Sequence, residues 1–149
     1  MSYIETPKPK QGCVFCQALD QQDGPDNLIV TRGNYCFVIL NRYPYTSGHL
    51  MVLPFLHVST LLELDPDIRT EMFELAVKCT EVLDQVYHVE GFNIGANIGA
   101  AAGAGIEEHV HLHIVPRWQG DTNFMSSLGK TRVLPETLEQ TYRRVLKVW

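Results

Sequence analysis

Short apolar runs separated by turn residues predict β-strands in the first third of the chain. Residues 28–30 follow a Gly-Pro-Asp-Asn turn, and residues 35–40 follow a Gly-Asn pair of the hairpin type. A third apolar run at 49–53 is ended by Pro54. We therefore expect consecutive strands before the first long helix.

A long helix is predicted next, because apolar residues recur there at helical spacing. Asp65 is placed to cap its start, Pro66 suits the first helical position, and Gly91 closes the segment. A final helix is predicted from near Pro135. The apolar face of the long helix comprises Ile68, Met72, Leu75, Ala76, Cys79, Val82, Leu83 and Val86, and that of the final helix comprises Leu138, Tyr142, Val145, Leu146 and Trp149.

Two further strands are predicted at 92–98 and 109–115, on either side of a glycine- and alanine-rich segment at 99–105. This order of elements predicts the α+β class, with an antiparallel five-stranded sheet, one long helix and a C-terminal helix. We expect residues 1–11 to form a flexible tail and residues 12–149 a single domain that includes a C-terminal extension.

Composition adds limits on partners and location. The 149 residues are 45% hydrophobic and 19% charged, as in an average globular domain. The net charge of −5 argues against a nucleic-acid partner, although backbone amides can still hold a small anion. The sequence contains neither a signal-like apolar segment nor a membrane-spanning run. We therefore expect a soluble, cytoplasmic protein without a membrane partner.

The four cysteines fall into two kinds. Cys36 and Cys79 lie in apolar surroundings and are expected to be small buried hydrophobic residues. Cys13 and Cys16 have the Cys-x-x-Cys spacing of metal ligands, which alone is half a site. A reduced pair of packed thiols is the alternative.

Histidines occupy every second position of the predicted strand at 109–115. Because a strand turns successive side chains to opposite faces, His109, His111 and His113 share one face and the apolar residues between them face the core. Same-face neighbours lie ~6.6–7 Å apart, so three in a straight row reach one metal ion poorly. The histidine face is therefore expected to open onto a site, with a row of surface histidines as the structural alternative.

A nucleophilic role for His111 explains this pattern better. A neutral imidazole attacks well near pH 7 when its other nitrogen is held as N–H, and flanking histidines can fix the tautomer and relay protons. The segment 99–105 has almost no side chains, so its backbone N–H groups can approach phosphate oxygens. A flexible connector would look the same, but its position just before the histidines favours a phosphate site.

These residues resemble the histidine triad family. The motif is His, apolar, His, apolar, His and two apolar residues, and it matches 109–115. The resemblance runs from about Cys13 to Arg117. The segment 48–54 resembles the Gly-His-apolar strand of the family. Four further segments resemble the branch of diadenosine polyphosphate hydrolases and phosphorylases: 41–44, 91–95, 116–124 and the tail through Pro135.

The resemblance implies a dinucleoside polyphosphate substrate and a role for each site residue. His111 would attack the α-phosphorus and carry the nucleotidyl group covalently, while His113 and His49 support and orient it. The implied substrate-binding residues are Asn41 at the ribose, Asn97 at ribose or phosphate, the loop residues Gly103, Gly105 and Ile106, and Phe15, Ile39 and Met51 around the base. Plain core packing is the alternative for the last three.

The loop departs from the family pattern at two positions. The family usually carries a polar side chain where Gly105 stands, and a small hydroxyl residue where Ile106 stands. Backbone amides or a water molecule would then have to contact the phosphates. The identity of the second substrate, water or inorganic phosphate, stays open.

The resemblance also implies a cofactor and a partner. Zinc-bearing members complete the cysteine pair with a histidine after the Gly-His strand and with the first triad histidine. His57 and His109 stand at those places, so Cys13, Cys16, His57 and His109 are expected to hold a structural Zn²⁺. A homodimer is also implied, and Mg²⁺ accompanying the nucleotide is a further expectation.

Other functions stay open at this point. They are hydrolysis of nucleoside phosphoramidates within the same family, nucleotide binding with little catalysis, and metal-dependent catalysis by the histidine cluster. The related sugar-nucleotide transferases carry proline between two of the histidines, whereas Val110 and Leu112 stand here.

Overall fold

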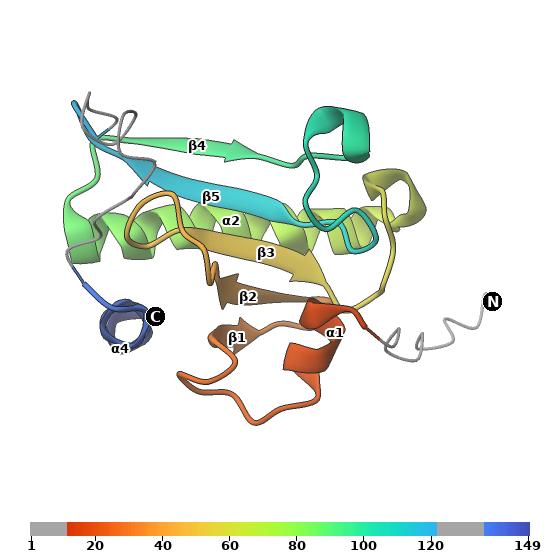
Figure 1. The fold of residues 1–149 in the computed structure, drawn as a ribbon, viewed down its shortest axis with the longest axis horizontal. Coiled ribbons are helices and arrows are strands. Elements are labelled where there is room, and N and C mark those ends of the chain that lie inside the picture. The colour runs from red at the N-terminus through yellow and green to blue at the C-terminus, as the bar shows by residue number, and fades with distance from the viewer. Residues whose placement is uncertain (1–11, 122–135) are drawn as a thin grey trace.

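The computed structural model describes residues 12–121 and 136–149 (Figure 1). The expected tail at 1–11, the start of a helix near Pro135 and the family-like segment at 122–124 lie outside the described residues. The sheet is five-stranded and antiparallel, with the order β1-β2-β3-β5-β4. Its strands are β1 (Ile29–Arg32), β2 (Cys36–Leu40), β3 (Leu50–Pro54), β4 (Gly91–Gly95) and β5 (Leu112–Arg117). The predicted α+β class is confirmed.

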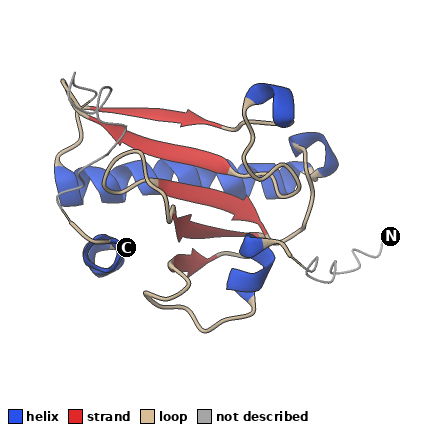
Figure 2. Ribbon diagram, viewed as in Figure 1, coloured by secondary structure: helices blue, strands red, loops and turns tan. Residues whose placement is uncertain are grey.

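Helices cover this sheet unevenly. The described helices are α1 (Val14–Leu19), α2 (Pro66–Tyr87) and α4 (Leu138–Val148), with short 3-10 turns η1 (Leu61–Glu63) and η2 (Ala100–Ala102). The long helix α2 runs behind the sheet, and the short helical turns gather at one end of it (Figure 2). Sequence patterns did not predict α1, which contains Cys16 and has Cys13 at its N-cap position.

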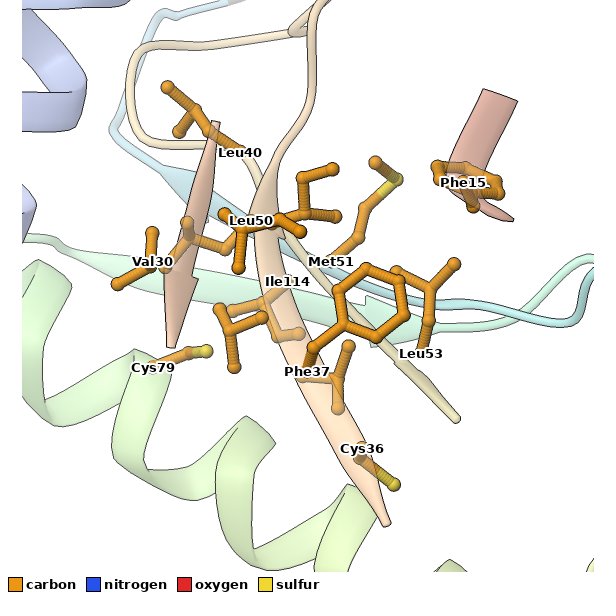
Figure 3. Close-up of a cluster of buried hydrophobic side chains, with 14 of the residues drawn as sticks. Phe15, Val30, Cys36, Phe37, Leu40, Leu50, Met51, Leu53, Cys79 and Ile114 are labelled. Carbon is orange, nitrogen blue, oxygen red and sulfur yellow. The ribbon is translucent and has the colours of Figure 1, made fainter. Parts of the chain in front are cut away.

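The core lies between α2 and the sheet, as the helical repeat predicted. Cys36 Sγ donates to the backbone carbonyl of Ile68, 3.7 Å away, so the Cys36 side of β2 faces α2. Cys36 and Cys79 are fully buried, which confirms their expected role, and Cys79 projects from α2 toward the sheet in Figure 3. The buried residues of α2 are Ile68, Met72, Ala76, Cys79, Val82 and Leu83, while Leu75 and Val86 are partly buried against them.

The ends of α2 differ from the prediction. Asp65 occupies the N-cap position with Pro66 after it, but its side chain makes no capping hydrogen bond. The helix ends at Tyr87, where His88 adopts the left-handed conformation with φ of 52°. Gly91 does not close the helix; it begins β4. Histidine tolerates this conformation better than a β-branched residue, so no glycine is needed to stop the helix.

The two strands around the glycine-rich segment are also displaced. β4 ends at Gly95, not at residue 98, and β5 covers Leu112–Arg117, not 109–115. The chain enters β5 through a different pairing, in which the Val110 N–H donates to the Val58 carbonyl at 2.7 Å. This contact holds the segment with His109 and His111 against the segment after β3. Both histidines therefore precede the first residue of β5.

Glu71 fastens the β1–β2 hairpin to α2 through its carboxylate. The backbone N–H groups of Asn34, Tyr35 and Cys36 donate to it at 2.9, 2.6 and 2.7 Å. We expect Glu71→Gln to lower the free energy of unfolding by roughly 1–3 kcal/mol, because charge-assisted hydrogen bonds are lost. Urea unfolding would measure this change in the free energy of unfolding. Glu74→Gln, an exposed site one turn on, is the control, and equal stability of both variants would contradict this role.

Candidate functional site

The strand register places three of the expected site residues in one row. Ile39 pairs with Met51, Met51 pairs with His113, and His113 pairs with Gly95 of the edge strand. Since the Cys36 side of β2 faces α2, alternation turns Ile39 to the opposite face. This row therefore lies on the face of the sheet away from α2.

His111 lies next to this row with a defined tautomer. Its Nδ1 is 2.9 Å from the backbone carbonyl of His109, which can only accept, so Nδ1 carries the proton. The lone pair is consequently on Nε2. The rings of His113 and Phe15 lie 4.7 and 5.3 Å away, centroid to centroid. Burial lowers the pKa of His111, which favours the neutral ring that a nucleophile needs.

His113 and His49 form a second pair with defined tautomers. The Tyr45 backbone N–H donates to His49 Nδ1 at 3.3 Å, and Asn41 Nδ2 lies 3.4 Å from the same atom. Since Nδ1 accepts, the His49 proton is on Nε2, which donates to His113 Nδ1 at 2.9 Å. His113 then keeps its own proton on Nε2. Burial lowers the pKa of His113 to about 4, so this ring is neutral and offers an N–H donor.

His49 is held in place by tight packing at the start of β3. It is fully buried, and the preceding Gly48 has a φ of +85°. A Cβ atom on Gly48 would lie 2.8 Å from Leu83 Cδ2, closer than van der Waals contact allows. The left-handed backbone, together with the close approach of the Leu83 side chain, therefore favours glycine at this position.

The Cys-x-x-Cys pair meets two histidines in a compact cluster. One ligand atom from each of Cys13, Cys16, His57 and His109 lies within 4.8 Å of the others. His109 Nδ1 is 3.6 Å from each cysteine Sγ, and His57 Nδ1 is 3.3 Å from Cys16 Sγ. Sulfur and nitrogen ligands of one tetrahedral zinc lie about 3.6 Å apart, from their usual bond lengths. The donor set and its spacing therefore fit a metal ion.

Neighbouring acceptor groups lie at the outer nitrogens of both histidines of the cluster. His109 Nε2 donates to the Pro54 carbonyl at 2.8 Å, and His57 Nε2 lies 3.8 Å from the Glu108 carboxylate. The hydrogen bond to Pro54 leaves the His109 lone pair on Nδ1, facing the cysteines. Burial lowers the pKa of His109 to about 4, which keeps its ring neutral as a ligand must be.

The histidine face is less open than expected. His109 is fully buried and His111 is only 7% exposed, with the ring of Phe15 against both. A hollow of about 510 Å³ lies beside the metal cluster, and its lining includes His57, Glu63, Glu107 and Glu108. Its acidic lining makes it a poor match for a polyphosphate chain.

The predicted substrate-binding residues occupy different environments. Phe15, Ile39 and Met51 are all buried in the core cluster. Asn97, Gly103 and Gly105 are exposed in the glycine-rich loop, and Ile106 is partly buried. Asn41 is half-buried, and its Oδ1 accepts the Tyr43 N–H at 2.9 Å, which turns Nδ2 toward His49. Their substrate roles stay predictions.

Sequence reasoning missed the groups that set the tautomers. The backbone N–H of Tyr45 and the carbonyls of Pro54 and His109 act through main-chain atoms, which no residue type reveals. The Tyr45 ring also stacks on His49, with centroids 5.2 Å apart and planes at 19°. Glu108 could have been noticed as an acidic neighbour of His109 in sequence.

Across residues 12–121 and 136–149, no helix combines the length and apolar character that a bilayer crossing demands.

Comparison with known proteins gives a consistent result. The sequence profile described as HIT domain matches residues 22–120. An AP-4-A phosphorylase of Mycobacterium tuberculosis is 39% identical over 131 residues, which are 88% of this chain and 67% of that protein. An asymmetrical bis(5'-nucleosyl)-tetraphosphatase of Schizosaccharomyces pombe is 35% identical over 82 residues, 55% of this chain and 44% of that protein. A zinc-bound histidine triad family protein from Mycobacterium smegmatis superposes with a TM-score of 0.73 at 27% identity, and 92% of each chain is covered.

Proposed function

The chain belongs to the HIT domain family, and from this membership we propose that it cleaves dinucleoside polyphosphates at the α-phosphate through a nucleotidyl-histidine intermediate. The observation that carries the proposal is the tautomer of His111, whose lone pair is on Nε2 because Nδ1 donates to a carbonyl at 2.9 Å. The named activities of the phosphorylase and tetraphosphatase relatives support the substrate class.

The first step transfers the nucleotidyl group to the protein. The Nε2 lone pair of His111 forms a bond to the α-phosphorus as the bond from phosphorus to the bridging oxygen breaks. The electron pair leaves with the nucleoside polyphosphate. The Nε2–H of His113, fixed by His49, donates a hydrogen bond to the phosphate oxygens or to the leaving oxygen as charge develops there. The backbone N–H of Gly105 would face the same oxygens, whereas that of Gly103 donates to the Ala100 carbonyl at 3.0 Å.

The second step releases the nucleotide and restores the free imidazole. An oxygen of water or of inorganic phosphate attacks the phosphorus, and the phosphorus–nitrogen bond breaks with its electron pair returning to His111 Nε2. The proton that the attacking water or phosphate gives up passes to the solvent. With phosphate as acceptor, diadenosine tetraphosphate gives ADP and ATP; with water it gives AMP and ATP. The similarity to an AP-4-A phosphorylase favours phosphate.

Product analysis by phosphorus NMR tests this assignment. We expect the chain to convert diadenosine tetraphosphate to ADP and ATP when inorganic phosphate is present, and to slow sharply without it. AMP and ATP at equal rates with and without phosphate would make it a hydrolase. Nucleotide binding with no turnover on either this substrate or a nucleoside phosphoramidate would contradict the enzymatic role.

We assign a structural zinc ion to Cys13, Cys16, His57 and His109. Their ligand atoms lie within 4.8 Å of one another, and a zinc-bound family member superposes on this chain. When bound, zinc joins α1 to the segment before β5 and takes His109 out of the reaction chemistry. Mg²⁺ accompanying the nucleotide stays a prediction.

A homodimer is proposed through the free edge of the sheet. β4 is an edge strand, and Ile94, which registers with Ile114 on the α2 side, is 43% exposed. Phe73 and Val77 of α2 are 60% and 50% exposed. A sheet edge that pairs with no other described strand and carries an exposed apolar side chain fits a second copy of the chain.

We expect Ile94→Asp to weaken this dimer by about tenfold or more, because a buried charge would be left without a partner. Light scattering over a concentration series would measure the mass. Leu62→Asp is the matched control, since Leu62 is 89% exposed in η1. A wild-type chain that is monomeric at every concentration would refute the proposed dimer.

A further inference from the structure

His109 belongs to both the metal cluster and the candidate catalytic group. Its side chain faces Cys13 and Cys16, with Nδ1 3.6 Å from each Sγ. Its backbone carbonyl accepts the Nδ1–H of His111 at 2.9 Å, the contact that leaves a lone pair on His111 Nε2. One residue therefore connects the ligand cluster with the nitrogen that would attack phosphorus.

Phe15 provides a second connection between the same two groups. It stands between Cys13 and Cys16 in α1 and is 5% exposed. Its ring lies 5.7 Å from the ring of His109 and 5.3 Å from that of His111. Any change in how the cysteines are held moves the aromatic surface against which His111 packs.

The other catalytic pair is fixed from a separate part of the chain. His49 receives the Tyr45 N–H at 3.3 Å, and His49 Nε2 donates to His113 at 2.9 Å. These contacts come from the loop between β2 and β3 and involve no ligand of the cluster. The tautomers of His49 and His113 should therefore not depend on the metal.

We propose that the metal cluster positions the nucleophile. Ligation fixes His109 and α1, and the His109 carbonyl with the Phe15 ring then holds His111 in a single orientation with Nδ1 protonated. The importance of this for turnover rests on the function proposed above. The effect on the orientation of the His111 ring does not depend on that function. A failure of this positioning and a failure of the proposed function can therefore be told apart.

The test is ¹⁵N NMR of the histidine rings, with and without zinc. In the zinc-loaded chain, His111 should show one protonated Nδ1 and one unprotonated Nε2. After chelation, its two ¹⁵N shifts should move toward each other as the tautomers mix, while those of His49 and His113 stay in place. AMP, as the binding probe, should bind about tenfold more weakly. Unchanged His111 shifts in a folded, zinc-free chain would overturn the proposal.

Two further experiments keep the proposal testable if the chain unfolds without metal. Cadmium, with longer bonds to sulfur, replaces zinc in the folded protein and should shift His111 more than His49. Phe15→Leu keeps all four ligands and should broaden or shift the His111 signals, whereas Phe73→Leu should not, because Phe73 is 60% exposed on α2. Equal shifts of His111 and His49 with cadmium, or identical spectra for the two variants, would overturn the coupling.

Discussion

Replacing His111 with alanine is expected to lower kcat for diadenosine tetraphosphate on the order of 10⁴-fold or more, since removing a covalent nucleophile removes the chemical path itself. The remaining residues of the site would still bind nucleotide, so AMP affinity should change far less than turnover. The rate is measured by following ADP and ATP formation. Zinc content of the variant reports that the neighbouring cluster is intact.

The control for this variant is His88→Asn. His88 is an exposed histidine at the end of α2, and asparagine tolerates its left-handed backbone. This change should leave turnover within about twofold of the unmodified chain, as for surface substitutions in general. If His111→Ala turned over as fast as His88→Asn, the assignment of the nucleophile would be wrong.

Removal of one metal ligand should have the largest effect on stability. Cys16 lies within contact of both cluster histidines, and it is buried. We expect Cys16→Ser to abolish zinc binding and to lower the free energy of unfolding by about 4 kcal/mol or more, because metal binding is coupled to folding. For a chain of this length, that corresponds to a fall in Tm of roughly 8–16 °C.

A chelator separates loss of the metal from loss of the thiol. Chelation should lower the Tm of the unmodified chain to near that of Cys16→Ser and should leave the variant almost unchanged. Zinc content by elemental analysis accompanies each thermal scan. A Tm that does not respond to chelation in the unmodified chain would mean that the cluster is a packed pair of thiols and two histidines.

The fold was predictable where a single periodicity dominates. The apolar repeat from Ile68 to Val86 places α2 correctly. The apolar runs at 35–40 and 49–53 predict β2 and β3 to within a residue at each end. The end of α2 was not predicted correctly, because His88 in the left-handed conformation ends the helix, and not Gly91. The helix α1 has too few residues for a periodic pattern to appear.

The site was predictable in its residue types but not in its arrangement. Alternation placed His109 and His111 on a strand, whereas the pairing of Val110 with Val58 keeps both ahead of β5. Local patterns contain no information about such a contact between distant segments. The same holds for the main-chain groups of Tyr45, Pro54 and His109, which decide where the imidazole protons lie.

The most direct test of the central claim is to trap the bond between His111 and the nucleotidyl group. The chain is mixed with diadenosine tetraphosphate without inorganic phosphate, quenched in alkali and analysed by peptide mass spectrometry. The account predicts one adenylyl group on the peptide that contains His111, which disappears with formation of ADP when phosphate is added. Full turnover with no adduct, or an adduct on another residue, would contradict it.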